Sequence, residues 1–211
     1  MEIASSARNQ DAISRLVNSI VVPRPIAWIT SRSAKDENNL SPFSYFQVVS
    51  VDPVIVMVCF NDEKHTYLNI CETKEFVINS VTAANVDLAV MSSADVDRSV
   101  DEAAELGVDF VPSVTVAAPR LAMSPTALEC VLHSTTQVGT GRLIFATVQH
   151  VYIDDAIVEE HERIDVRKFA PVGRMGSNYY SIAESWRGID RPTVEDFEAF
   201  TLSTAQCRRA M

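Results

Sequence analysis

The sequence predicts a mainly β fold with inserted helices, and three features carry this prediction. Apolar, β-branched runs separated by turn residues occupy much of positions 20–81. Two longer apolar runs after position 126 are joined by a short glycine-containing turn, and the acidic stretch before them has helical spacing. Because 211 residues, 47% of them hydrophobic, suffice for one core, we expect a single domain over 1–211.

Three strand-like runs open the chain. Residues 20–31 are apolar and β-branched, with prolines only near the start, which suits a strand entered through an extended Pro-Arg-Pro lead. The polar stretch 32–39 separates this run from 40–49, and the turn residues 50–53 separate that run from 54–60. Turn signals at such short intervals indicate an antiparallel meander or barrel.

Helices are expected between the strands. Residues 62–74 place three apolar side chains on one side of a short helix of about two turns, ahead of the apolar run 75–81. Residues 83–107 are acidic, and their apolar positions recur at roughly helical spacing. One or two surface helices are therefore predicted there.

A long β-hairpin is expected in the second half of the chain. The runs 127–138 and 142–153 are joined by Gly139-Thr140-Gly141. A short connection that contains glycine is typical of a hairpin, so these two runs are predicted to pair.

The C-terminal segment from about residue 189 is expected to form an arm. Thr193 precedes acidic residues as a helix cap does, and Phe197 and Phe200 share one helical face. This pattern predicts a helical arm that packs against the protein.

Charge and composition exclude several classes of partner. The formal net charge of −10 and the isoelectric point near 4.8 disfavour attraction to phosphate polymers and anionic lipid, so neither nucleic acid nor a membrane is expected as a partner. No apolar run approaches the roughly 20 residues that span a bilayer, and the first residues lack the order of a signal peptide. We therefore expect a cytoplasmic protein.

Familiar catalytic and metal-binding patterns are missing. The four cysteines are scattered without a CxxC pair and the four histidines share no ligand spacing, so we expect reduced thiols and no metal site, with Cys59 and Cys130 packed in the core. The signatures GxSxG, HExxH and GxxxxGK are absent, as is GxGxxG after a strand. Standard hydrolase, metalloprotease and Rossmann chemistry lose support, and no catalytic residue is assigned.

Hydroxyl, aromatic and basic residues crowd around the predicted turns. Strand ends rich in serine and threonine beside lysine and arginine can hold a phosphate, because backbone N–H groups, hydroxyls and cations converge there. Taken singly these residues are ordinary turn formers, and only their combination favours a ligand site. The set comprises Thr30, Ser31, residues 41–46, Ser50, Lys64, His65, Thr66 and Arg174.

Four segments of the chain form a specific pattern. They are PRPIAWITS (23–31), NLSPFSYFQVVSVDPVIVMV (39–58), KHTYLNICETKEFVIN (64–79) and PVGRMGSNYY (171–180). In order and spacing they resemble the flavin reductase-like, FMN-binding split-barrel family, and the resemblance covers about residues 20–180. The long tail departs from it, as does His65, where similar sequences often carry a small or acidic residue. The resemblance implies a split β-barrel that forms an intimate homodimer, with one FMN near each side of the subunit interface.

The resemblance implies which residues meet the phosphate end of FMN. Thr30 and Ser31, at the end of the first strand, would contact the ribityl chain and phosphate. Lys64, His65 and Thr66 would hold the phosphate at the start of a helix, where the dipole and unpaired N–H groups favour an anion.

A second group would surround the isoalloxazine ring. Ser44, Tyr45 and Phe46 would frame the edge of the ring largely through backbone groups, with Ser50 close to its polar rim. Arg174 would approach the flavin from its own subunit or from the partner.

The implied reaction is hydride transfer from NADH or NADPH to the flavin N5. This chemistry belongs to the cofactor and needs positioning more than an acid–base residue, in agreement with the missing catalytic signatures. Reduced flavin would then be released, or its electrons passed to an acceptor such as a partner oxygenase. Two alternatives share the fold: a carrier or sensor that binds FMN or a related ligand without reducing it, and an FMN enzyme that acts on a specific organic substrate.

Overall fold

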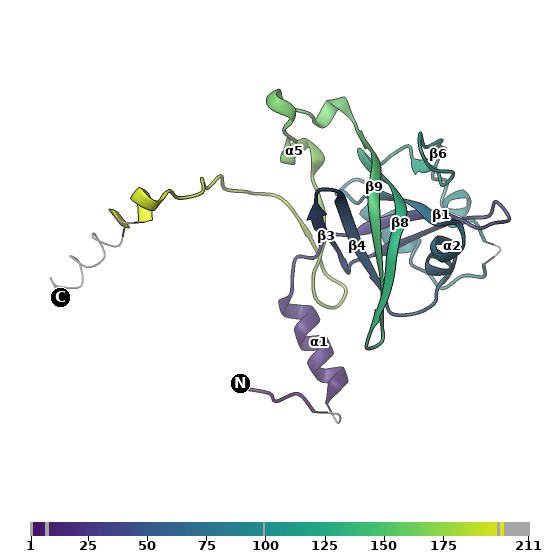
Figure 1. The fold of residues 1–211 in the computed structure, drawn as a ribbon, viewed down its shortest axis with the longest axis horizontal. Coiled ribbons are helices and arrows are strands. Elements are labelled where there is room, and N and C mark those ends of the chain that lie inside the picture. The colour runs from purple at the N-terminus through teal and green to yellow at the C-terminus, as the bar shows by residue number, and fades with distance from the viewer. Residues whose placement is uncertain (1, 7–8, 99, 198, 201–211) are drawn as a thin grey trace.

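The centre of the protein is one seven-stranded antiparallel sheet (Figure 1). The computed structural model describes residues 2–6, 9–98, 100–197, 199 and 200. The strands run in the order β2-β1-β5-β8-β9-β4-β3. Their bounds are β1 (Ala27–Arg32), β2 (Asn38–Phe43), β3 (Phe46–Val51), β4 (Val54–Phe60), β5 (Glu75–Ser80), β8 (Thr126–Val138) and β9 (Gly141–Ile153).

Short helices and two small sheets surround this sheet. The helices are α1 (Gln10–Ile20), α2 (His65–Thr73), α3 (Val86–Met91), α4 (Glu102–Glu105), α5 (Val166–Phe169), and the 3-10 turns η1 (Asp155–Ile157) and η2 (Glu160–Glu162). The small sheets pair β6 (Phe110–Val111) with β7 (Arg120–Leu121), and β10 (Val172–Arg174) with β11 (Tyr180–Ile182). Within the described ranges, no helix is long and apolar enough to cross a membrane.

The two edge strands of the large sheet are consecutive in the chain. β2 ends at Phe43 and β3 begins at Phe46, so only Ser44 and Tyr45 join opposite edges of the sheet. The three Cα–Cα steps from Phe43 to Phe46 span at most about 11 Å, so the sheet must curl until its edges meet at this point. β2 and β3 are not paired with each other in the sheet, so the barrel is split between these two edges.

The core lies on both faces of β1. Ala27 and Ile29 pack inside the barrel with residues of β4, β5, β8 and β9, whereas Trp28 points the opposite way, into a cluster covered by α3 and α4. Successive side chains of a strand alternate between faces, so a strand covered on both faces is apolar throughout rather than alternating. This explains the uninterrupted apolar run of the sequence at these positions.

The structure confirms the mainly β class with inserted helices and most of the expected elements. The helix expected over 62–74 is α2, the acidic stretch 83–107 contains α3 and α4, and the predicted hairpin is β8 and β9. The prediction of one strand over 40–49 was wrong, because this run forms β2 and β3 with the turn between them.

The two ends of the chain differ from the prediction. Most of the first predicted run lies outside β1, because α1 extends to Ile20 and an irregular Pro-Arg-Pro segment follows. Thr193 caps a terminal helical turn, Phe197 is 65% exposed and the arm extends away from the sheet of its own chain (Figure 1), so the packing of the arm stays a prediction. Residues 198 and 201–211 lie outside the described part.

Candidate functional site

A cavity of about 500 Å³ opens at the split between the edge strands. The connection Ser44-Tyr45 and the last residues of β4 form one side, and α3 and the β10–β11 turn form the other. Aromatic and apolar side chains make up much of its wall, namely those of Phe43, Phe60, Val81, Val86, Ala89 and Tyr180. Three cations, Arg24, Lys64 and Arg174, line it at different places, together with the carboxyl group of Asp62. We call this the first cavity.

A second cavity of about 310 Å³ continues the first along the start of α2. The two share Ser41, Asp62, Lys64 and Ser93 as lining residues. Lys64 is the N-cap residue of α2, and its ammonium lies 3.7 Å from the carboxylate of Asp95. Together the two cavities form a groove with an apolar end and an end at a helix N-terminus.

Arg24 holds three segments together at the rim of the first cavity. Its guanidinium donates to the Asn18 carbonyl at 2.6 Å, to the Ser44 hydroxyl at 3.4 Å and to the Met175 carbonyl at 3.3 Å. The Tyr45 hydroxyl donates to Asn18 Oδ1 at 2.6 Å. Asn18, near the end of α1, is therefore bonded to both Arg24 and Tyr45. The sequence did not single out Arg24, although the Pro-Arg-Pro motif marks it.

Arg174 lies across the cavity from the edge strands. Its guanidinium donates to the Tyr180 hydroxyl and to the Ser177 carbonyl, and it stacks 4.6 Å from the centre of the Tyr180 ring. The backbone groups of Arg174 and Arg24 pair through two hydrogen bonds of 2.8 and 3.0 Å. Both guanidinium groups that line the first cavity therefore come from residues of one isolated β-bridge.

Thr66 and His65 line the second cavity, as does a buried polar network. The Thr66 hydroxyl donates to Asn39 Oδ1, and Asn39 Nδ2 donates to Glu102 at 2.7 Å. Burial raises the pKa of Glu102, although hydrogen bonds from the Leu40 N–H and from Asn39 oppose this. Because the hydroxyl proton of Thr66 is already donated to Asn39, this residue has only its backbone N–H to donate to an anion.

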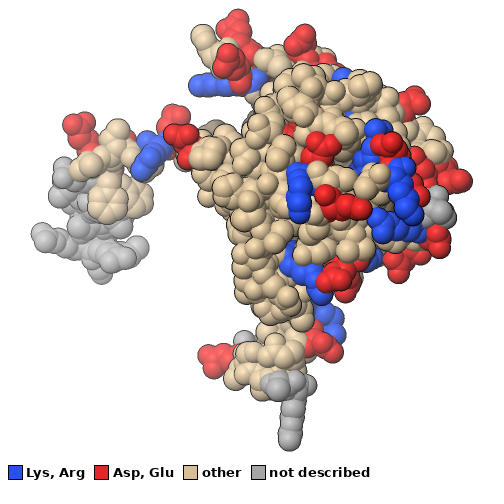
Figure 2. All heavy atoms as spheres, turned by 45° about the vertical axis from the view of Figure 1, so that its right-hand side comes forward, with Lys and Arg blue, Asp and Glu red and all other residues tan. Residues whose placement is uncertain are grey.

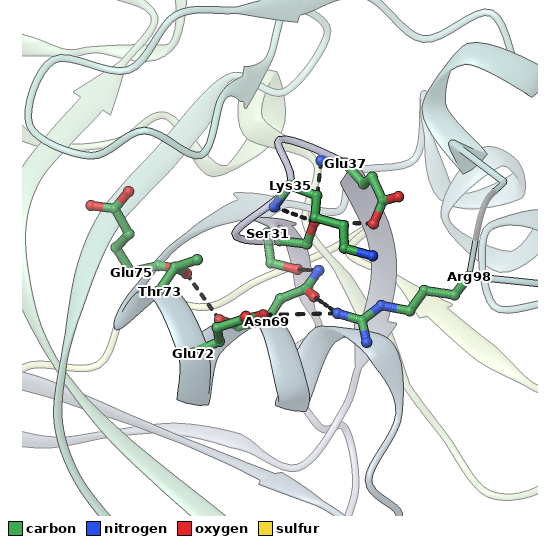
Figure 3. Close-up of polar contacts among 9 residues, drawn as sticks. Ser31, Lys35, Glu37, Asn69, Glu72, Thr73, Glu75 and Arg98 are labelled. Carbon is green, nitrogen blue, oxygen red and sulfur yellow. Dashed lines mark hydrogen bonds and ion pairs between the residues drawn. The ribbon is translucent and has the colours of Figure 1, made fainter.

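Thr30 and Ser31 do not reach either cavity. Both are buried; Thr30 donates to the Pro119 carbonyl, and the Ser31 hydroxyl accepts a hydrogen bond from Asn69 at 3.2 Å. Asn69 in turn accepts a hydrogen bond from Arg98 at 3.0 Å, so Ser31 is the inner end of a polar chain behind α2 (Figure 3). The structure places these two side chains in the interior, and their contact with the ribityl chain and phosphate stays a prediction.

Two further predicted residues lie outside the lining, and one unpredicted residue belongs to it. Phe46 packs against the barrel core, and Ser50 lies on β3 away from both cavities. Cys59, expected in the core, is half-buried and lines the first cavity, because it points away from the barrel interior that Val58 and Phe60 fill. Burial raises the pKa of its thiol. Cys130 is fully buried, as expected.

The structure thus brings six of the predicted residues together in one groove. Ser44, Tyr45 and Arg174 line the first cavity, His65 and Thr66 line the second, and Lys64 lines both. An apolar compartment continued by a cationic helix start suits a flat aromatic ligand with an anionic tail.

Comparisons with known proteins agree with this geometry. The model of the flavin reductase like domain matches residues 19–180. The crystal structure of the 2-nitrobenzoate 2-nitroreductase NbaA of Pseudomonas fluorescens is 30% identical in sequence, with a TM-score of 0.85, 92% of this chain covered and 98% of that one. An uncharacterized protein of Deinococcus radiodurans is 32% identical over 95% of this chain and 89% of its own. Nitrilotriacetate monooxygenase component B of Bacillus cereus shares the fold at 19% identity, with a TM-score of 0.82 and coverages of 90% and 99%.

Proposed function

The chain belongs to the flavin reductase-like family of oxidoreductases, with a split-barrel fold, and from this premise we propose that it binds FMN in the groove and reduces it with NADH or NADPH. The observation that carries the proposal is the groove itself, in which an aromatic compartment is continued by Lys64 and the start of α2. The family accounts for a flavin, and the groove favours one with a phosphate.

The residues of the groove fit FMN by the chemistry of their donors. Phe60 and the apolar side chains of α3 offer a surface for the ring, and Ser44 and Tyr45 line the same cavity. Lys64 offers an ammonium next to helix N–H groups, the combination that binds a phosphate at other helix starts. When bound, the flavin would supply the hydride chemistry.

The chain itself would position the reactants and restrict water. Arg24 connects the end of α1, Ser44 and the β10–β11 turn, and Tyr180 holds Arg174 in the cavity wall. No side chain transfers a proton in this reaction, so no residue of the chain is assigned as catalytic.

An anaerobic titration tests this function. Protein loaded with FMN and freed of excess flavin is mixed with NADH and, separately, with NADPH while the visible flavin absorbance is followed. We expect rapid bleaching with at least one of the two nucleotides, which would also identify the preferred donor. Persistent absorbance with both would overturn the reductase function and leave the binding site in place.

A second candidate is an FMN enzyme that reduces an organic nitro compound. It is favoured by the similarity to the 2-nitrobenzoate nitroreductase, at 30% identity over nearly the full length of both chains. Arg174 would suit a carboxylated substrate, because a guanidinium can bind a carboxylate with two parallel hydrogen bonds. Arg24 is less suited, because four of its five N–H donors already bond to groups of the chain. Consumption of NAD(P)H that depends on added 2-nitrobenzoate, with FMN retained through gel filtration, would favour this candidate.

The oligomeric state, the cellular location and the fate of the reduced flavin are also proposals. We propose a homodimer in the cytoplasm, formed by one domain per chain. Release of reduced flavin to a partner oxygenase is consistent with the shared fold of a monooxygenase component, and flavin that is easily lost in gel filtration would support it. A flavin carrier without reductase activity would show retained FMN and no bleaching.

A further inference from the structure

The ammonium of Lys64 already has a partner where the proposed phosphate subsite lies. Asp95 Oδ1 is 3.7 Å from Lys64 Nζ, and both residues line the second cavity. The carboxyl groups of Asp62, Glu63 and Glu102 line the same cavity. A phosphate that enters therefore meets an ammonium that is partly neutralised and surrounded by carboxyl groups.

The segment that carries Asp95 is fixed at both ends. Before it, the Ser92 hydroxyl accepts a hydrogen bond from Trp28 Nε1 at 2.9 Å, in the buried cluster beneath α3. After it, Arg98 donates to Asn69 at 3.0 Å and lies 3.9 Å from Glu72, both on α2 (Figure 3). Each anchor is three residues from Asp95, so the structure keeps this segment close to Lys64 at the start of α2.

We propose that Asp95 is a specificity-determining residue that competes with the phosphate of the flavin for Lys64. The inference rests on the proposed function, because it presumes that the groove binds a phosphorylated flavin. Its consequence is a weakened preference for FMN over riboflavin, and thus a flavin that exchanges easily. Asp95 itself is 92% exposed, so solvent screening limits the effect to about two- to fivefold in affinity.

The test compares FMN and riboflavin on matched variants. Dissociation constants are measured by flavin fluorescence for the parent and for Asp95→Asn, which removes the charge and keeps the shape. We expect Asp95→Asn to tighten FMN about two- to fivefold and to leave riboflavin unchanged. Asp36→Asn removes the same charge in the β1–β2 turn, where positive φ suits asparagine, and should change neither affinity.

A double-mutant cycle identifies the route of the effect. If Asp95 acts through Lys64, the gain from Asp95→Asn disappears in a Lys64→Met background. A gain in FMN affinity that persists in the Lys64→Met background, or an equal gain from Asp36→Asn, would overturn the inference. The effect would then come from the net charge of the protein and not from competition for Lys64.

Failure of the inference is distinguishable from failure of the proposed function. If Lys64→Met weakens FMN but Asp95→Asn changes nothing, the phosphate subsite stands and the competition is overturned. If the parent binds FMN and riboflavin equally and Lys64→Met has no effect, the phosphate subsite itself is overturned, and the inference with it.

Discussion

Individual side chains at the rim of the first cavity are held in place by the protein itself. Arg174 is bonded to Tyr180 and Ser177, and Arg24 to four backbone or side-chain groups. A cation held in position loses less side-chain entropy when a ligand arrives, so its contribution to binding is larger than that of a free side chain.

Replacement of Arg174 tests this contribution. Arg174→Ala should weaken FMN about tenfold or more, since a hydrogen bond to a charged group contributes about 1.5–3 kcal/mol, and Arg174→Lys should recover part of the loss. Fluorescence titration measures both. Unchanged affinity in Arg174→Ala would remove this residue from the site.

Glu129 is a buried carboxylate away from the groove, and it fastens the loop before β7. It is 1% exposed and accepts hydrogen bonds from the Val114 and Thr115 N–H groups and from the Thr115 hydroxyl. Burial alone would raise the pKa of Glu129, but these hydrogen bonds outweigh burial and lower the pKa below its usual value. The charged form is therefore favoured in the folded state.

The sign of the pKa shift gives a prediction for stability against pH. The contribution of Glu129 is fully present above its unfolded pKa of about 4.3 and is lost as pH falls through the lowered folded value. Glu129→Gln should lower the free energy of unfolding by about 1.5–3 kcal/mol at pH 7, and the difference from the parent should shrink as pH falls below about 4. Urea unfolding of the variant and the parent at pH 7 and below about pH 4 measures this difference in free energy. A difference that is the same at both pH values would contradict the prediction.

The residue types of the site could be predicted from the sequence, but not the direction of every side chain. Lys64 and Arg174 line the groove as expected because long cations at turns reach solvent-filled space. Thr30 and Ser31 turn inward because β1 is covered on both faces, and this depends on β5, α2 and the segment before β7. The role of Arg24 depends on Met175, 151 positions away, which no local pattern reveals.

At the scale of elements, α1 is attached to the protein only near its C-terminal end. None of its eleven residues, all of them described, is buried, and its apolar side chains Leu16, Val17 and Ile20 are 40–75% exposed. A Cβ built on Gly176 would lie 2.7–2.9 Å from atoms of Ser19, including its Cα. The β10–β11 turn therefore packs against the end of α1 as closely as a glycine allows.

A methyl group at this junction should uncouple α1 from the cavity. Gly176→Ala should push the turn away from Ser19 and weaken the hydrogen bonds of Arg24, so FMN affinity should fall several-fold through about 1–3 kcal/mol of overpacking. Amide hydrogen exchange should rise in α1 with little change in the barrel. Gly188→Ala, where a Cβ would meet nothing within 4 Å, serves as the control and should leave both readouts unchanged.

Strands could be predicted from the sequence where residues close in the chain determine how they end and pair. The hairpin of β8 and β9 follows from its own turn, because Gly139 adopts the positive φ that the tight connection requires. The division of 40–49 into β2 and β3 could not be predicted, because Ser44 and Tyr45 carry no glycine or proline signal. The curl of the whole sheet imposes this break.

At the scale of the whole molecule, apolar surface is concentrated on segments that have little of their own chain to cover them. Val48, Val49 and Val51 of the edge strand β3 are 47–85% exposed. Apolar residues of α1 and of the C-terminal arm are also exposed. Figure 2 shows charged side chains gathered on one part of the body and a wide uncharged area beside it, toward the projecting helix at the bottom of the view. Exposed apolar patches of this kind mark interfaces, and an edge strand is a favoured place for them.

The proposed homodimer gives this surface an occupant and makes a prediction. Sedimentation equilibrium should give twice the mass of the chain, and Val51→Asp should shift it toward the monomer, because a charge buried without a partner at an interface costs several kcal/mol. Met123→Asp places the same charge at an exposed apolar residue after β7 and should leave the mass unchanged. If FMN affinity falls together with dimer content in Val51→Asp, the groove is completed by the second copy. A parent protein that sediments as a monomer at micromolar concentration would contradict the homodimer and leave the exposed face of β3 for a different partner.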